Sequence, residues 1–300
     1  MGKKAILIGC NYPGTKAELK GCVNDVHRMR RSLVDRFGFA ATDIAVLIDT
    51  DDSYTQPTGG NIRRAINRLV LSGRPGDHLF VHFSGHGARL PADPSDHDNT
   101  GYHECIVPCD MNLIVDEDFR RYADKIPNGC RLTIVADSCN SGGLLENAKE
   151  QIGESTKSGR ALPLSHVADI LKKNTGIEEI RPGNLRSAIL GIFGEAASPR
   201  LRVRNTATEE LEGYRAGEGI LISACQSDQN AADAKPVSSP EGAFGALSNA
   251  IQGILGEAEG RNLSNREVVA MAREMLEKKG FTQRPGLYCS DEDADERFLA

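Results

Sequence analysis

The chain has 300 residues, a net charge of −6 and an apolar fraction of 39%, which suits a globular core in one large domain or two small ones. It contains no Trp, few other aromatic residues and no dominant basic stretch, so the usual features of a nucleic-acid-binding protein are missing. The apolar run after Lys4 is too short for a signal peptide or a membrane span, which indicates a cytosolic or nuclear protein with no membrane segment.

The eight cysteines are scattered along the chain and form no CxxC pair. Zinc sites built from cysteine usually contain such pairs, and cytosolic cysteines are usually reduced. We therefore expect free thiols and neither a disulfide framework nor a zinc centre.

Short apolar runs alternate with amphipathic stretches over the first 140 residues. Residues 5–9 and 44–48 are continuous apolar runs that predict strands, and residues 24–37 repeat apolar positions with a helical period. The turn at residues 57–61 opens a second helix that extends to residue 70. This alternation is typical of a mostly parallel sheet covered by helices.

Two further predicted strands each lead directly into a glycine-rich segment. Residues 79–83 precede Ser84-Gly85-His86-Gly87, and residues 132–136 precede Asp137-Ser138-Cys139-Asn140-Ser141-Gly142-Gly143. The loops that leave the carboxyl ends of parallel strands meet at one edge of the sheet, where ligands bind in open α/β folds. We therefore expect His86 and Cys139 to meet at that edge.

The remainder of the chain divides into a polar part and an ordered part. Residues 145–217 are rich in charged and turn-forming residues, which predicts a linker or insertion with short helices at 164–171 and 185–193. The other expected elements are a loop at 91–101, strands at 105–108, 219–224 and 285–289, and helices at 243–255 and 265–279. Ser264 is placed to cap the helix at 265–279.

A cysteine and a histidine are the two groups that a thiol hydrolase requires. The thiolate is the nucleophile, and a histidine stabilises it and later protonates the leaving amine. The N–H groups of Gly87 and Cys139 are the expected donors to the oxyanion of the tetrahedral intermediate. The alternative for Cys139 is a small apolar core residue, which is the commoner role of a buried cysteine.

The His86 and Cys139 segments together resemble a metacaspase, a relative of the caspases. The caspase pattern also places its His about 50 residues before its Cys. Segments similar to plant-type, type II metacaspases extend over nearly the whole chain, at residues 9–15, 21–26, 104–110, 150–153 and 287–290.

The resemblance implies an α/β fold, a caspase-like three-layer sandwich with a mostly parallel central sheet and helices on both faces. It implies a catalytic region at 1–144, a linker with an autoprocessing site at 145–217, and a smaller region at 218–300 that completes the same fold. It also implies a monomeric cysteine endopeptidase that cleaves proteins and peptides after Arg or Lys and is made as a zymogen. Arg160, which precedes Ala-Leu-Pro, matches the self-cleavage site of the family, so the linker itself is an expected substrate. The competing sites in the linker are Lys157, Lys172, Lys173 and Arg181.

Within the same resemblance, Asp25, Asp137, Cys22 and Ser84 match residues that line the S1 pocket of metacaspases. Carboxylates bind a guanidinium through charge-assisted and often bidentate hydrogen bonds, and they would repel an Asp at the same position. The alternative for Asp25 is a solvated residue in the first turn of a helix, where the helix dipole favours an acid.

Calcium is the cofactor that the resemblance implies, as an activator. The expected ligands are acidic residues on two loops, because hard cations bind several oxygen atoms. They are Asp96, Asp98, Glu104, Asp116 and Glu117. Glu117 departs from the family pattern, in which Asp is expected.

Two other functions compete with the protease. A catalytically silent caspase-fold scaffold that binds basic peptides would need neither His86 nor Cys139. An asparagine-specific peptidase of the same broad clan would predict a secretory context and a different pocket.

Overall fold

The computed structural model describes residues 1–92, 101–138, 150–152, 161–202, 219–224, 233–234, 242–258 and 261–299. A seven-stranded sheet with the order β2-β1-β3-β7-β9-β12-β8 forms its centre. The strands are β1 (Lys3–Gly9), β2 (Ile44–Ile48), β3 (His78–Ser84), β7 (Arg131–Asp137), β8 (Glu150–Ile152), β9 (Ile220–Ser223) and β12 (Gly286–Tyr288). The first five in spatial order are parallel, whereas β12 is antiparallel to both β9 and β8.

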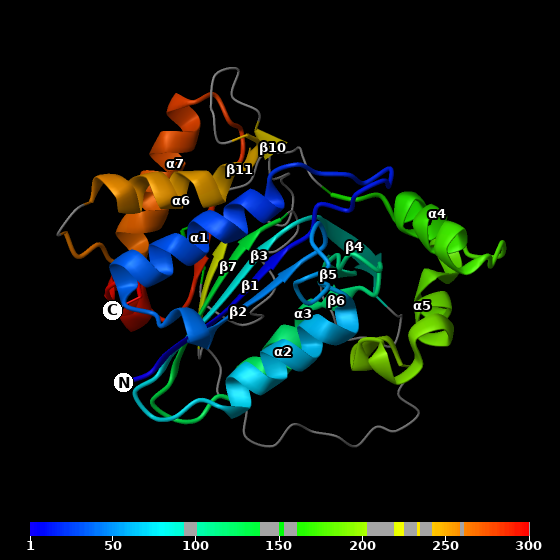
Figure 1. Ribbon diagram of the computed structural model, residues 1–300, viewed down its shortest axis with the longest axis horizontal. Helices are drawn as coiled ribbons and strands as arrows, with labels where there is room; N and C mark the ends of the chain where they lie inside the picture. Colours follow the sequence, from blue (N-terminus) through cyan, green and yellow to red (C-terminus); the bar gives the residue numbers. More distant parts are fainter. Residues whose placement is uncertain are drawn as a thin grey trace.

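Helices cover both faces of this sheet (Figure 1). One face carries α1 (Cys22–Phe37), α6 (Ala246–Glu257), α7 (Asn265–Lys278) and the short α8 (Asp291–Asp295). The other carries α2 (Gly59–Leu71), α3 (Asp116–Ala123), α4 (Leu164–Thr175) and α5 (Leu185–Phe193). Successive strand residues point to opposite faces, so Leu7 packs in one apolar cluster and Ile8 in the other. The predicted three-layer α/β fold with a mostly parallel sheet is confirmed.

A second sheet of three antiparallel strands begins directly after β3 in the chain. It contains β4 (Gly87–Pro91), β5 (Tyr102–Ile106) and β6 (Ile114–Val115), and a separate two-stranded ladder joins β10 (Asp233–Ala234) to β11 (Phe244–Gly245). The sequence did not predict β4, because its five residues include Gly and Pro and show no clear alternation. The strand expected at 105–108 lies earlier, at Tyr102–Ile106. Helix α3 was also missed, since its first turn consists of charged residues.

The helix starts show how local sequence sets the element boundaries. Thr58 accepts a hydrogen bond of 3.2 Å from the N–H of Asn61 at the start of α2. The predicted cap at Ser264 is confirmed, because Ser264 and Glu267 form a capping box at the start of α7. Helix α1 follows a glycine, and the side chain of Asn11 substitutes for the missing cap by accepting from the N–H of Cys22 at 3.0 Å.

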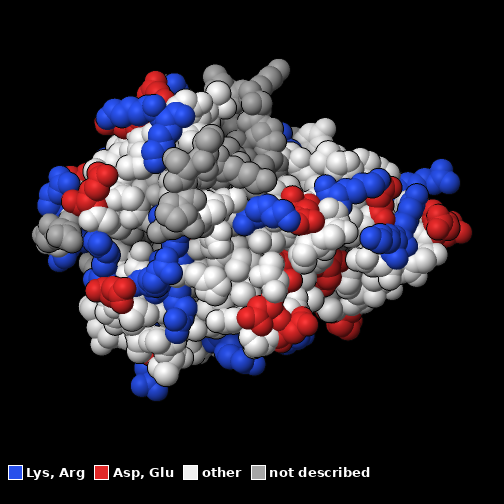
Figure 2. All heavy atoms as spheres, turned by 45° about the horizontal axis from the view of Figure 1, so that its top comes forward, with Lys and Arg blue, Asp and Glu red and all other residues white. Residues whose placement is uncertain are grey.

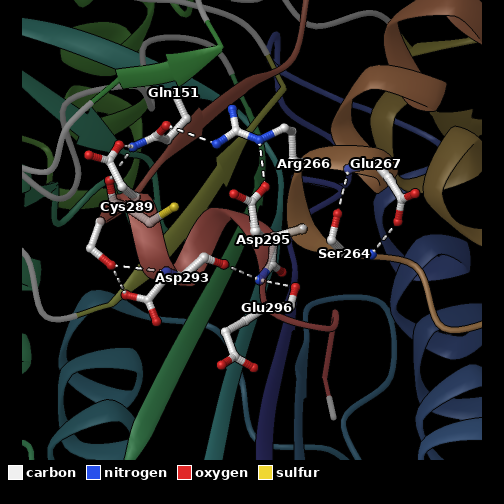
Figure 3. A network of polar contacts seen from close by, with 11 residues as sticks. Gln151, Ser264, Arg266, Glu267, Cys289, Asp293, Asp295 and Glu296 are labelled. Carbon is white, nitrogen blue, oxygen red and sulfur yellow. Dashed lines mark hydrogen bonds and ion pairs between the residues drawn. The ribbon is translucent and has the colours of Figure 1, made fainter.

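The predicted linker contributes ordered elements to the fold. Both of its expected helices are present, as α4 and α5, and β8 forms an edge strand of the main sheet. Figure 3 shows how Gln151 on β8 is held: its amide donates to Asp291 at 2.8 Å and accepts from Arg266 at 3.2 Å. Arg266 also donates to Asp295 at 2.8 Å, so this network joins β8 to α7 and α8. The predicted boundaries at 144/145 and 217/218 lie outside the described residues.

Two further properties concern the described part of the chain. Its six cysteines are free thiols, namely Cys10, Cys22, Cys105, Cys109, Cys130 and Cys289. None of its helices is long and apolar enough to cross a membrane. On the face drawn in Figure 2, Lys and Arg lie among Asp and Glu and form no continuous basic surface in the described part.

Candidate active site

His86 follows strand β3, and Cys139 follows β7, the neighbouring strand at the centre of the sheet. The two strands are parallel, and their register pairs Ser84 with Asp137, so both strands end at the same edge of the sheet. Cys139 itself lies outside the described residues; Ser138, the described residue before it, is fully buried. The strand register therefore brings the two predicted loops to one edge, as expected from a parallel sheet.

The imidazole of His86 has a main-chain partner. Its Nε2 lies 2.8 Å from the carbonyl oxygen of Ala17, and the side chain is largely buried. A carbonyl oxygen only accepts, so Nε2 carries the proton and donates, and in the neutral ring Nδ1 holds the lone pair. The sequence indicated no third member for a catalytic triad. The structure places a backbone carbonyl beside the imidazole, a contact that no residue type could have indicated.

The predicted S1 residues Asp25, Asp137 and Ser84 are brought together. Both aspartates are fully buried, which excludes the alternative of a solvated Asp25. The Ser84 hydroxyl donates to Asp25 Oδ2 at 2.8 Å. Cys22 is also fully buried and lies three residues before Asp25 on α1, so the two share one face of the helix.

The N-terminal turn of α6 faces both carboxylates. The N–H of Gly245 donates to Asp25 Oδ2 at 2.8 Å, and the N–H of Ser248 donates to Asp137 Oδ2 at 2.7 Å. A Cβ at Gly245 would lie 2.7 Å from Asp25 Oδ2 and still closer to a carboxylate oxygen of Asp137, so only glycine fits here. Free N–H groups and the helix dipole stabilise negative charge at such a position.

Gly245 and Ser248 are site residues that the sequence analysis missed. They belong to the predicted C-terminal region, whereas Asp25 and Asp137 belong to the N-terminal region. Their contribution is made by main-chain N–H groups, which every residue except proline carries, so residue type gives no signal of this role, even at Gly245, where only glycine fits.

The predicted calcium ligands fall into two groups. Asp96 and Asp98 lie outside the described residues. Glu104 and Glu117 have basic partners: Arg89 lies 3.6 Å from Glu104, while Arg120 and Arg121 pair with Glu117. The carboxylate of Asp116 accepts from the N–H of Glu104 at 3.2 Å. Within the described ranges, no three His, Cys, Asp or Glu side chains gather as metal ligands would.

The described chain resumes at Ala161, directly after the predicted cleavage site, and there it lies beside the residue that follows His86. Arg160 lies outside the described residues, but Ala161 forms a parallel bridge with Gly87. The N–H of Leu162 donates to the carbonyl oxygen of Gly87 at 2.9 Å, and the Leu162 side chain is buried in the core.

The sheet, its helices and the His86 loop define a caspase-type α/β protein, and comparison with known proteins supports this class. A family model described as "Metacaspase, peptidase C14 domain" matches residues 3–148. The chain is 46% identical to Metacaspase-6 and 42% identical to Metacaspase-4 of Arabidopsis thaliana, each over 100% of both proteins. Metacaspase-1 of Scheffersomyces stipitis is 34% identical, over 99% of this chain and 73% of that protein.

The chain therefore belongs to the metacaspase family, and this membership supports a cysteine peptidase. The family expected from the sequence motifs is confirmed. A crystal structure of protein GSU0716 from Geobacter sulfurreducens has a TM-score of 0.66 and 20% identity, and it covers 100% of this chain and 99% of that chain. That likeness concerns the fold alone.

Proposed function

We propose that this metacaspase is an endopeptidase that cleaves proteins after Arg or Lys. The observation that carries the proposal is that the carboxylates of Asp25 and Asp137 lie close together. Both are buried, and an oxygen of each lies within 3 Å of the position that a Cβ at Gly245 would occupy. They lie at the sheet edge from which β3 and β7 lead to His86 and Cys139. Two adjacent carboxylates favour a guanidinium or ammonium group by charge and by hydrogen-bond donors, and they disfavour an acidic side chain.

In the proposed reaction, Cys139 is the nucleophile and His86 is the general base and acid. Because Nε2–H of His86 donates to the Ala17 carbonyl, Nδ1 is the nitrogen that takes the thiol proton. The thiolate attacks the scissile carbonyl carbon, the C–N bond breaks as the imidazolium protonates the leaving amine, and water hydrolyses the thioester. The N–H groups of Gly87 and Cys139 are the proposed oxyanion donors.

The proposal includes a zymogen that cuts itself after Arg160. Two described positions on either side of this residue support it. Gln151 is fixed on the edge strand β8, and Leu162 is fixed to Gly87. The residue that would follow the scissile bond, Ala161, therefore pairs with the neighbour of the proposed catalytic histidine.

Calcium activation is a further part of the proposal and depends on Asp96 and Asp98. Calcium requires six to eight oxygen ligands. A carboxylate that is already paired with an arginine must give up that partner to bind the ion. Glu104 and Glu117 fit this requirement less well, because arginines already neutralise them. Bound calcium would supply positive charge to the acidic loops.

Hydrolysis of matched fluorogenic peptides that end in Arg, Lys or Asp tests the proposal, with Cys139→Ala as the blank. Selective cleavage after Arg and Lys that requires Cys139 supports it. Cleavage after Asp at a comparable rate, or activity in Cys139→Ala, contradicts it. No cleavage of any peptide at acidic or neutral pH, with calcium present, supports the alternative of a silent scaffold that binds basic peptides.

A further inference from the structure

Tyr12 is a fully buried residue that contacts both the ring and the main chain of His86. The N–H of His86 donates to the Tyr12 hydroxyl at 2.9 Å, and this hydroxyl donates to the carbonyl oxygen of Val107 at 2.6 Å. The N–H of Val107 donates back to the carbonyl oxygen of His86 at 3.0 Å. The Tyr12 and His86 ring centroids are 5.0 Å apart. The N–H of His86 is thus fixed by the Tyr12 phenol, and its carbonyl oxygen is fixed by the N–H of Val107.

The backbone of Tyr12 is held in an uncommon conformation. Its φ is +50°, in the left-handed region that bulky residues rarely adopt, so the surrounding structure must stabilise it. Asp49, directly after β2, supplies two hydrogen bonds for this purpose. Its carboxylate accepts from the N–H of Asn11 at 2.9 Å and from the N–H of Tyr12 at 2.7 Å.

The loop that Asp49 holds also carries the partner of the imidazole. Ala17, five residues after Tyr12, accepts from His86 Nε2 at 2.8 Å. The loop is closed by a hydrogen bond of 2.8 Å from the N–H of Leu19 to the carbonyl oxygen of Asn11. One loop therefore presents the Tyr12 hydroxyl to the main chain of His86 and the Ala17 carbonyl to its side chain.

We propose that Tyr12 and Asp49 are positioning residues that fix His86 for proton transfer, an inference that rests on the proposed acid–base role of His86. Both act through His86 and not on the substrate. Proton transfer and nucleophilic attack depend steeply on geometry, and a displacement of about 1 Å can cost about 100-fold in rate. Loosening this loop should slow the chemical step. Asp25 and Asp137 should keep their places, because hydrogen bonds from Ser84, Gly245 and Ser248, which lie outside the loop, hold them.

The test uses Tyr12→Phe and Asp49→Asn with an Arg peptide. We expect kcat to fall about 10- to 100-fold in each variant, with KM within about twofold of the wild type. A second measurement needs no peptide: the pH dependence of Cys139 alkylation by iodoacetamide reports how well His86 stabilises the thiolate. In both variants the apparent thiol pKa should move up toward the ordinary value of about 8.5.

Asp77→Asn is the matched control. Asp77 also accepts from two main-chain N–H groups, those of Gly2 at 2.6 Å and Arg74 at 3.1 Å, but it lies at the opposite end of β3. We expect it to lower the thermal unfolding temperature without changing kcat or the alkylation profile. An equal loss of kcat in Asp77→Asn would mean that Asp49 acts only through stability and would overturn the proposal.

The outcomes separate this inference from the proposed function. If Cys139→Ala cleaves as fast as the wild type, the proposed function fails. If cleavage requires Cys139 but Tyr12→Phe and Asp49→Asn keep the wild-type kcat and alkylation profile, only the positioning role fails. Thermal unfolding shows which variants are folded, and Asp49→Asn tests the role independently if Tyr12→Phe does not fold.

Discussion

The N–H of Leu162 donates a hydrogen bond of 2.9 Å to the carbonyl oxygen of Gly87, the residue directly after His86. Leu162 is also buried, so the chain that follows the proposed cleavage site is fixed by both its main chain and its side chain. Before the site, Gln151 is fixed by hydrogen bonds to α7 and α8 (Figure 3). These two anchors favour cleavage of the Arg160–Ala161 bond by the active site of the same molecule, because a tethered substrate has a high effective concentration.

Arg160→Ala should stop self-cleavage, whereas Arg160→Lys should retain it. In denaturing gels the wild type should yield fragments 1–160 and 161–300, at a rate independent of protein concentration. Lys157→Ala is the control and should cleave like the wild type. Leu162→Asp should slow cleavage, because it buries a charge where Leu162 packs. A fragment boundary elsewhere, identified by mass spectrometry, would show that Arg160 is the wrong site.

The two fragments should remain associated after cleavage. Strand β9 pairs with β7 across the proposed cut, and Asn24 on α1 donates to the carbonyl oxygen of Ala243, just before β11, at 2.9 Å. Arg28 on α1 also donates to Asn249 on α6 at 3.0 Å. Size-exclusion chromatography of the cleaved protein should give one peak at the elution volume of the intact protein. Separate peaks for the fragments would contradict this prediction.

The parts of the molecule with strong local sequence signals were predicted from the sequence. The apolar runs of β1, β2, β3 and β7 mark buried strands, and the glycine-rich segments after β3 and β7 mark the functional edge. By contrast, β4 contains Gly and Pro, and its strand conformation depends on pairing with β5, which a local pattern does not contain.

The candidate site also divides into side chains that were predicted from the sequence and main-chain groups that were not. Asp25 and Asp137 were predicted because they match residues that line the S1 pocket of metacaspases, where a carboxylate suits a basic side chain. The Ala17 carbonyl and the Ser248 N–H were missed because they are main-chain groups that become functional only through tertiary placement. Tyr12 lies within residues 9–15, a segment similar to metacaspases, but its contact with His86 depends on a left-handed backbone that the residue type disfavours.

Asp25→Asn and Asp137→Asn should each reduce cleavage after Arg and Lys. Removing one charge from a buried ion pair costs about 2–5 kcal/mol, so kcat/KM should fall about 30-fold to several thousand-fold. Asp35→Asn, an exposed acid on the same helix as Asp25, is the control and should leave kcat/KM unchanged. Retention of Arg cleavage in both buried variants would place the S1 pocket elsewhere.

The double variant Asp96→Asn/Asp98→Asn should lose the response to calcium. Initial rates in EDTA and in millimolar calcium would be compared with those of the wild type. Glu117→Gln is the informative control, because its carboxylate already pairs with Arg120 and Arg121, and we expect it to keep the calcium response. Full wild-type activity in EDTA would show that calcium is not an activator of this chain.

His82 should make the stability of the protein depend on pH. It is fully buried on β3 and lies 3.0 Å from the Ser248 hydroxyl, and burial lowers its pKa to about 3. Between about pH 6.5 and pH 3 the unfolded state binds a proton at this histidine that the folded state does not. The free energy of unfolding therefore falls as the pH falls, by about 1.4 kcal/mol per pH unit from this group.

His82→Gln removes this titration and should flatten the pH dependence of the unfolding free energy. At pH 7 the variant should be less stable than the wild type by about 1 kcal/mol, because it loses the hydrogen bond to Ser248. At pH 4 it should be the more stable protein, because the wild type has lost about 3 kcal/mol there. Ser248→Ala loses the same hydrogen bond but keeps the histidine, so its pH slope should match that of the wild type. Urea titrations between pH 4 and pH 7 measure the three curves, and parallel curves for the wild type and His82→Gln would contradict a buried neutral His82.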